Sequence, residues 1–355
     1  MATLYAVLGY IAFGDKVAYI IFLKVLLVVA ALAWIAWLVF RSRGEKSILD
    51  FLALLLISTS SYTVANIVNI QVEEGFGFVG LAVCWAVLLY GASPERKGHL
   101  GGRGYHKHSI AILFGCSAAI ALLSKSSFVL CVAVLLVAFG YKFGLRYFLA
   151  CLLVVATSGV AWASYQYAGS GRFTIGTSLD GWNLYKGNNP YFLERYPPTP
   201  GTSLDMYDDD LFKDSPAGGE WVVNDFYREK SFAYILNNKE KAVAALKKKF
   251  WVCFFSVEKY GSTSSEGVRK YYELGSMILF RVVFWLSLGA AVADSFVRRQ
   301  RALGIAYILF VGGLLLPYLV GFAYTRHVSV LALPAVLYLL AFIRRNTVAP
   351  LEAPN

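Results

Sequence analysis

Two adjacent carboxylates, Glu73 and Glu74, stand directly before a long apolar run and are candidates for acid–base chemistry. A carboxylate at a membrane-facing cleft can act as a general base or bind a divalent metal ion. The alternative is that both are solvated charges at a helix start, where acidic side chains are favoured. The sequence leaves both interpretations open. A divalent metal is therefore a candidate cofactor, and no cofactor is certain.

Three basic side chains lie in short polar stretches between apolar runs. Lys125 stands in Leu-Leu-Ser-Lys-Ser-Ser, and Arg326 and His327 stand in Tyr-Thr-Arg-His-Val-Ser. Cations at such positions can bind the phosphate of an anionic headgroup. The alternative is that Lys125 and Arg326 extend to the membrane interface and that His327 is an ordinary hydrogen-bonded residue.

Arg281 differs from these cations because it lies near the middle of an apolar run. A cation deep in lipid costs about 2.5–3.5 kcal/mol on insertion scales, so we expect it to face the bundle interior or a polar cavity. It could line a path for an ion or a lipid phosphate, or it could be held by an internal ion pair. Glu273, two turns away, is a poor partner for such a pair.

The segment from Gly181 to Pro190, Gly-Trp-Asn-Leu-Tyr-Lys-Gly-Asn-Asn-Pro, is rich in Gly and Asn. Such a run forms tight turns, and it can present amides and an aromatic face to a sugar. Asn183, Asn188 and Asn189 are the candidate sugar ligands. The alternative is that the segment is a structural turn.

The composition places these residues in a membrane protein. Of the 355 residues, 58% are hydrophobic and only 15% are charged, and the mean hydropathy is +0.57. Soluble domains average about a quarter charged residues. These values exclude a disordered chain, a disulfide scaffold and an ordinary cytosolic enzyme.

Nine apolar stretches are long enough, or nearly long enough, to cross a bilayer. Their ranges are 17–40, 47–69, 76–92, 109–124, 127–141, 147–167, 273–293, 303–323 and 328–343. Because the runs are continuous rather than alternating, they predict helices and exclude a β-barrel. The predicted fold is an all-α polytopic membrane protein with about nine transmembrane helices. The stretches 109–124 and 127–141 are near the short limit and could instead form a re-entrant hairpin.

The distribution of Lys and Arg predicts the orientation. One set of alternate loops contains 14 Lys and Arg residues and consists of 41–46, 93–108, 142–146, 294–302 and 344–355. The short segments on the other side contain only Lys16, Lys125 and Arg326. Short loops rich in Lys and Arg stay in the cytoplasm. The net charge of +11 therefore indicates topology, and we expect no nucleic-acid partner.

One polar segment interrupts the apolar runs and divides the chain into three regions. We expect an N-terminal transmembrane region at 1–167, an external cap domain at 168–272 and a C-terminal transmembrane region at 273–355. Within the cap, 221–236 is predicted to be a helix. The stretch 239–255 is predicted to be an amphipathic helix on the membrane surface, with its lysines toward lipid headgroups.

The order of several short segments resembles a known family. The segments are Thr3–Asp15, the acidic pair Glu73–Glu74, Leu122–Lys125, Gly181–Pro190, Asn224–Ile235 and Tyr324–Pro334. In this order they resemble the bacterial GT-C glycosyltransferases related to protein O-mannosyltransferases and to the aminoarabinose transferase of lipid A. The resemblance implies a GT-C-like fold in the bacterial inner membrane, with the cap on the periplasmic or extracellular side.

The resemblance also implies a reaction. A sugar moves from a polyprenyl-phosphate donor to a hydroxyl of an acceptor glycan, lipid or protein, with inversion at the anomeric carbon. Glu74 best matches the catalytic acid at the start of the corresponding helix, followed by Glu73. Lys125 and Arg326, with His327 in support, match the phosphate-binding cations.

One departure from the family leaves other functions open. Family members begin with a further helix and an external loop that carries a catalytic acid, and this chain begins after the position of that loop. We therefore expect a start assigned too late, a truncated gene, or a protein that works without chemistry. The alternatives are a non-catalytic scaffold or binding subunit of a glycan assembly system, or a transporter of a lipid-linked glycan. Only Arg281 favours the transporter.

Overall fold

The computed structural model describes a chain built from helices and turns. The described residues are 26, 28–37, 39, 72–91, 103–196, 211–255, 268–298, 300–323 and 325–347. No β-strand occurs in these ranges, which confirms the all-α prediction for them. The chain forms two compact units. The first contains Met1–Ile175, Ile278–Gly313 and Val330–Asn355, and the second contains Gly176–Met277 and Leu314–Ser329.

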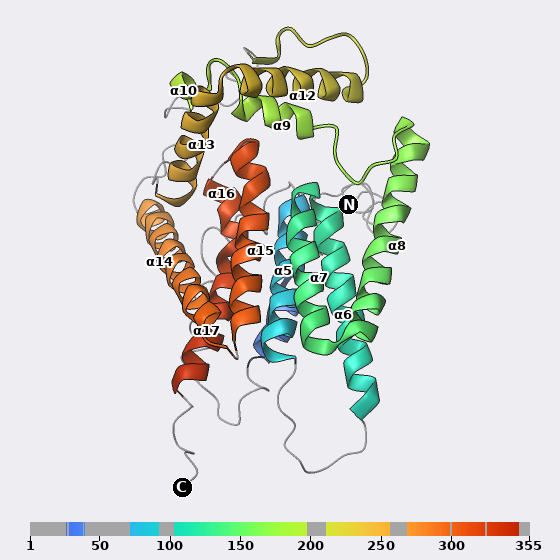
Figure 1. Cartoon of the computed structure of the whole chain (residues 1–355), viewed down its shortest axis with the longest axis vertical. Coiled ribbons are helices and arrows are strands. Elements are labelled where there is room, and N and C mark those ends of the chain that lie inside the picture. Colours follow the sequence, from blue (N-terminus) through green and yellow to red (C-terminus); the bar gives the residue numbers. More distant parts are fainter. Residues whose placement is uncertain are drawn as a thin grey trace. The chain divides into compact units, whose positions relative to one another are not determined.

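The first unit is a helical bundle. It contains α5 (Val72–Tyr90), α6 (Arg103–Ser124), the short 3₁₀-helix η1 (Ser126–Phe128), α7 (Val129–Phe143), α8 (Leu145–Ser170), all but the first residue of η2 (Ser329–Leu331), and α17 (Ala332–Thr347). It also includes parts of α14 (Val268–Phe296) and α15 (Arg301–Val320). Helices α5, α6 and α7 lie side by side (Figure 1).

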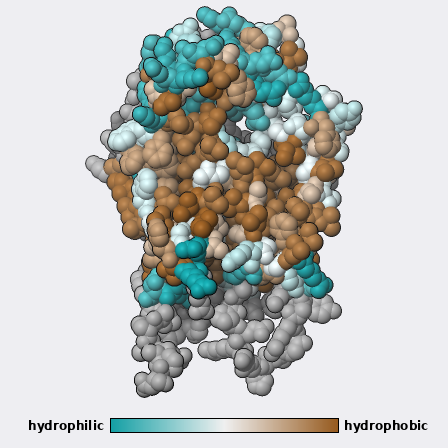
Figure 2. Space-filling model, in the orientation of Figure 1, coloured by the Kyte–Doolittle hydropathy of each residue, from teal (hydrophilic) through white to brown (hydrophobic). Residues whose placement is uncertain are grey.

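Four helical segments among the described residues are long and apolar enough to cross a membrane. They are Ser126–Phe143, Leu145–Ser170, Leu274–Phe296 and Arg301–Val320. Each coincides with a predicted span, so the described helices agree with an α-helical membrane protein. Figure 2 shows a broad band of hydrophobic residues over the bundle helices, with hydrophilic residues at its lower border.

The remaining predicted spans are shorter or lie partly outside the described residues. Phe76–Tyr90, His108–Ser124 and Val28–Trp37 are shorter apolar helices. The predicted span 47–69 lies outside the described residues, as does half of 17–40. The number of nine transmembrane helices therefore stays a prediction.

Small residues set the contact between α5 and α6. A Cβ atom added at Gly80 would lie 2.6 Å from the carbonyl oxygen of Ser117 and 3.3 Å from the backbone nitrogen of Ala121. The two backbones approach this closely because no side chain stands between them. Membrane helices commonly pack through such small residues, since lipid offers no hydrophobic drive to association.

An aromatic cluster joins α5 to α15 and α17. Trp85 is fully buried. Its ring makes edge contacts with Tyr307 at 5.2 Å, Phe310 at 5.3 Å and Tyr338 at 6.0 Å between centroids. Aromatic rings prefer such edge-to-face geometry because the positive edge of one ring meets the negative face of another.

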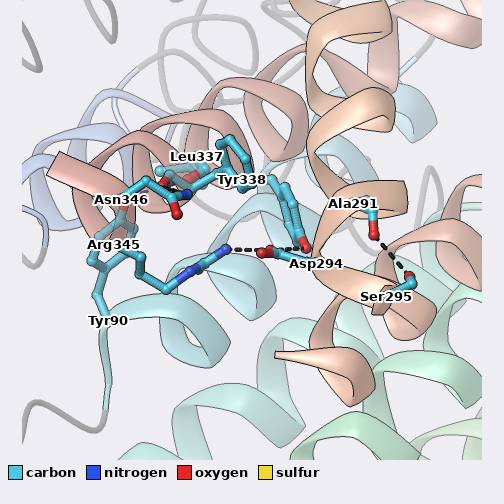
Figure 3. Close-up of polar contacts among 9 residues, drawn as sticks. Tyr90, Ala291, Asp294, Ser295, Leu337, Tyr338, Arg345 and Asn346 are labelled. Carbon is cyan, nitrogen blue, oxygen red and sulfur yellow. Dashed lines mark hydrogen bonds and ion pairs between the residues drawn. The ribbon is translucent and has the colours of Figure 1, made fainter. Parts of the chain in front are cut away.

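A buried ion pair lies next to Tyr338 of this aromatic cluster. Asp294, near the end of α14, is 3% exposed. It accepts a hydrogen bond of 2.7 Å from the Tyr338 hydroxyl and forms an ion pair with Arg345 (Figure 3). A buried carboxylate is tolerated only when it is paired and hydrogen-bonded. Residues 51 positions apart in the chain therefore neutralise one another.

The second unit packs short helices around aromatic side chains. Its helices include α9 (Asp180–Gly187), α10 (Phe192–Arg195), α12 (Glu220–Asn237), α13 (Lys239–Phe254) and α16 (Thr325–Val328). Helices α9 and α12 lie side by side (Figure 1). The buried cluster comprises Tyr185, Phe192, Tyr196, Leu211, Phe212, Tyr227, Ala245, Val252 and Phe322. Helix α12 confirms the predicted helix at 221–236.

Helix α13 confirms the helix predicted at 239–255 but corrects the prediction about its lysines. Lys247 is exposed, whereas Lys249 is only 1% exposed. Lys249 therefore does not reach toward lipid headgroups. The buried residues Ala245, Val252 and Cys253 stand four residues before and three and four residues after Lys249, so all four positions share one helix face.

We predict that Gly80→Ala lowers the thermal stability of the full chain in detergent. The added methyl group would meet backbone rather than a movable side chain, and overpacking of this kind costs about 1–3 kcal/mol. Gly289→Ala is the matched control, because Gly289 also lies inside a helix but has nothing within 4 Å of an added Cβ. Alanine should leave stability there unchanged or raised. Equal unfolding temperatures for both variants would contradict the proposed close contact.

Candidate functional site

The first glycine of the segment Gly181–Pro190 lets α9 lie against α12. The Gly181 amide donates a 2.6 Å hydrogen bond to Oδ1 of Asn224. A Cβ atom at Gly181 would lie 2.0 Å from the Asn224 carbonyl oxygen. No other residue type would fit this contact without displacing one of the helices.

The second glycine brings the end of α9 onto the residues that follow α15. A Cβ atom at Gly187 would lie 1.8 Å from the Gly321 carbonyl oxygen. The adjacent Asn188 side chain bridges the same two segments, because its Nδ2 donates to the carbonyls of Leu184 at 2.8 Å and Val320 at 2.7 Å. The segment Gly181–Pro190 thus packs against the end of α15 and the residue that follows it.

Asn189 is satisfied within its own turn. Its Nδ2 donates to the carbonyls of Tyr185 and Lys186, both at 3.0 Å, and its Oδ1 accepts from the Tyr191 amide at 2.9 Å. Asn188 and Asn189 are 5% and 0% exposed, whereas Asn183 is exposed. Of the three predicted sugar ligands, two therefore use their amides to build the fold. The segment is structural, but Asp180–Gly187 forms helix α9 and not the predicted tight turn. Asn183 alone is open to solvent.

A buried ammonium group, that of Lys249, also binds both the end of α15 and Asn188. Lys249 Nζ donates to the carbonyls of Leu319 at 3.1 Å and Val320 at 3.3 Å, and to Asn188 Oδ1 at 3.4 Å. It also lies 5.2 Å from the centre of the Phe192 ring. Carbonyl oxygens at a helix end have no partner within the helix, so α13 supplies the donor for the last turn of α15. Sequence reasoning missed this residue, although its spacing from buried apolar positions on α13 could have revealed it.

The environment of Lys249 changes its titration. Burial lowers the pKa of this ammonium group from its ordinary value of 10.5 to about 7, and a smaller interaction with Cys253 opposes the change. Desolvation disfavours the charged form of a lysine. The group therefore titrates near neutral pH in the folded chain.

The predicted phosphate-binding pair lies next to the segment that Lys249 holds. Arg326 and His327 belong to α16, and only the backbone of Arg326 is described. His327 is 6% exposed, and its ring stacks on Tyr318 with centroids 4.1 Å apart and planes 17° apart. The Tyr196 hydroxyl donates to the Ala323 carbonyl. Residues of the cap segment and of the last helices thus fix the chain that leads into α16.

The first turn of α5, which carries the predicted acids, and the turn that carries Lys125 lie at the same end of the first unit. Glu73 and Glu74 lie in the first turn of α5, where the structure describes their backbone. Gly77 follows one turn later, and a Cβ atom there would lie 2.2 Å from the Phe128 ring and 3.3 Å from Ser124 Cβ. Lys125, half-buried, stands between those two contacts. The structure therefore brings the backbone of the acidic pair close to the turn that carries Lys125.

Arg281 and the candidate metal site complete the predicted set. Arg281 is half-buried on the part of α14 that belongs to the first unit. Among the residues that the structure describes, no group of three or more His, Cys, Asp or Glu side chains could hold a metal ion.

Comparisons with known proteins return no relative of the chain: no family model, no curated protein and no solved structure matches it.

We predict that the stability contributed by Lys249 depends on pH. Between pH 7 and 10.5 the folded state has released this proton while the unfolded state keeps it, so the unfolded state binds more protons and stability rises with pH. The limiting slope for one proton is about 1.4 kcal/mol per pH unit. In Lys249→Met, which lacks the group, this contribution is absent.

The measurement is the unfolding temperature of the full chain in detergent between pH 6.5 and 9. The difference between wild type and Lys249→Met should shift in favour of wild type as the pH rises. Lys247→Met, two residues away and exposed, should show no such trend. A difference that stays constant with pH would show that Lys249 does not titrate in this range.

Proposed function

We propose that the chain is a membrane glycosyltransferase that moves a sugar from a polyprenyl-phosphate donor to an acceptor hydroxyl. The observation that carries the proposal is the proximity of the first turn of α5, with Glu73 and Glu74, to the turn containing Lys125. A candidate base and a candidate phosphate-binding cation thus lie at the same end of a bundle with membrane-spanning helices. The resemblance of the sequence to GT-C enzymes supplies the reaction.

In the proposed reaction the acceptor oxygen attacks the anomeric carbon from the face opposite the phosphate. The new carbon–oxygen bond forms while the bond to the phosphate oxygen breaks, which inverts the configuration. Glu74 takes the proton of the acceptor hydroxyl, with Glu73 as the second candidate. General bases of this kind contribute about 10²–10⁴-fold to a rate.

The departing polyprenyl phosphate carries negative charge that needs stabilisation. Lys125 is the candidate cation in the first unit, and Arg326, with His327 in support, is the second. Preorganised cations stabilise charge that develops in a transition state. A divalent metal ion could do the same.

The proposed location is the bacterial inner membrane, with the segment 168–272 on the periplasmic or extracellular side. The excess of Lys and Arg in the opposite set of loops supports this orientation. On this topology Glu73, Glu74 and Lys125 also face outward. The acceptor could be a glycan, a lipid or a protein.

A second candidate is a non-catalytic scaffold or binding subunit of a glycan assembly system. The hydrogen bonds of Asn188 and Asn189 favour it, because amides that could hold a sugar are used inside the fold. The experiments below distinguish the two candidates.

We predict that Glu74→Gln abolishes sugar transfer and leaves the chain folded. Loss of the general base should reduce the rate by about 10²–10⁴-fold. The assay follows radiolabelled mannose from polyprenyl-phosphate mannose into the membrane fraction of cells that express the protein. Glu229→Gln, on the exposed face of α12, is the matched control and should transfer normally. Normal turnover by Glu74→Gln would remove Glu74 from the mechanism. Transfer by wild type of neither mannose nor aminoarabinose from polyprenyl-phosphate donors would favour the scaffold.

We predict that Arg326→Ala weakens binding of the same donor, because the phosphate loses a charge-assisted contact. The measurement is donor affinity of the purified chain by displacement of a fluorescent polyprenyl phosphate. Arg228→Ala removes a cation whose ion pair with Asp225 is formed at 2.7 Å on the exposed surface of α12, and it should bind as wild type does. Unchanged affinity in Arg326→Ala would show that this residue serves only the membrane interface.

A further inference from the structure

A hydrophobic groove with a cationic end opens between α5, α7 and α15 in the first unit. Its volume is about 650 Å³, which lies within the range of about 300–1,000 Å³ typical of ligand sites. Its walls include Leu88, Ala133, Val137, Ala138, Leu303 and Leu309. Val137 and Leu309 are 67% and 55% exposed, so apolar side chains also form its open rim.

Two cations and an amide lie at one end of this groove: Lys142, Arg345 and Gln300. Lys142 Nζ donates to the carbonyl of Leu88, in the last turn of α5. That bond occupies one of the three N–H donors of the ammonium group. The remaining donors can bind a further acceptor.

The charges at this end are not balanced within the described chain. Arg345 is paired with Asp294, but its buried Nε has no hydrogen-bond partner. Lys142 and Arg345 are close enough to interact electrostatically. Of these two neighbouring cations, only Arg345 is paired with a described carboxylate, and an anion at this position would relieve the repulsion between them.

The length of the groove matches one leaflet of a bilayer. On α7 its wall extends from Ala133 to Lys142, nine residue steps, or about 14 Å at 1.5 Å per residue. The hydrocarbon core of a bilayer is about 30 Å thick. An acyl chain whose headgroup lies at Lys142 would thus end near the middle of the membrane.

We propose that this groove binds an anionic phospholipid, with one acyl chain along α7 and α15 and the phosphate between Lys142 and Arg345. The loops at this end, 142–146 and 344–355, belong to the set rich in Lys and Arg, which places the lipid in the cytoplasmic leaflet. The occupant is a bilayer lipid rather than the sugar donor. Leu88 is at the end of α5 opposite to Glu73 and Glu74, about 20 Å away along the helix. The proposal goes beyond the transferase activity and does not depend on it.

The test counts lipids bound to the purified full chain by native mass spectrometry, with phosphatidylglycerol and phosphatidylcholine of identical acyl chains. We expect wild type to bind phosphatidylglycerol more tightly than phosphatidylcholine. Lys142→Gln should weaken phosphatidylglycerol binding about fivefold, which corresponds to about 1 kcal/mol for one cation near an anionic headgroup. Lys142→Arg keeps the charge and should bind as wild type does.

Two further variants separate this site from general attraction to anionic lipid. Arg146→Gln removes an exposed cation near Lys142 that does not line the groove, and it should leave binding unchanged. Ala138→Phe fills the groove without changing charge, so it should release the bound lipid while the unfolding temperature confirms a folded chain.

Three outcomes would overturn the proposal. In the first, Lys142→Gln and Arg146→Gln weaken binding equally, which would indicate attraction to the whole basic end of the bundle. In the second, phosphatidylcholine binds as tightly as phosphatidylglycerol. In the third, added polyprenyl phosphate displaces phosphatidylglycerol from this groove, which would identify an isoprenoid site instead.

Discussion

The ammonium group of Lys249 and the backbone carbonyls of Leu319 and Val320 satisfy one another's hydrogen-bonding needs in the protein interior. Lys249 is 1% exposed and bonds to the last turn of α15 and to Asn188. An unpaired polar group in such surroundings costs about 1–3 kcal/mol or more, so neither partner is stable there alone. These hydrogen bonds of Lys249 position the end of α15, which precedes Arg326 and His327 in the chain. The close contact of Gly187 with Gly321 lets the same segment lie directly on the end of α9.

The same rule governs the polar residues of the membrane bundle. Asp294 is buried with Arg345 and Tyr338, and Lys142 bonds to a carbonyl in the last turn of α5. Each interaction joins helices that are distant in sequence. Asp294, Arg345 and Lys142 lie near helix ends, whereas Tyr338 lies near the middle of α17. Apolar packing, as around Trp85, fills the space between them. Polar pairs thus specify which helix ends meet, while apolar contacts supply most of the buried surface.

The two functional proposals use opposite ends of one helix. The proposed transferase site lies at the start of α5, and the proposed phospholipid lies beside the end of α5. A lipid that fills the groove would contact α5, α7 and α15 at the end of the bundle opposite to the proposed transferase site. Such a lipid would stabilise the bundle without competing with the sugar donor, because their headgroups would lie in different leaflets.

The amino-acid sequence by itself indicated the membrane class, the all-helical fold, four of the spans and the helices α12 and α13, because hydrophobic length and periodicity act over neighbouring residues. It also determined that an acidic pair opens α5. It did not indicate α9 and α10. Only the tertiary structure decided that Lys249 is buried, that Asn188 and Asn189 bond within the fold, and that Asp294 meets Arg345. The bonds of Lys249, of Asn188 to Val320 and of Asp294 to Arg345 join residues 51 to 132 positions apart, whereas Asn189 bonds within its own turn. Whether a polar side chain faces water, lipid or a carbonyl is set by those partners, and no local pattern contains them.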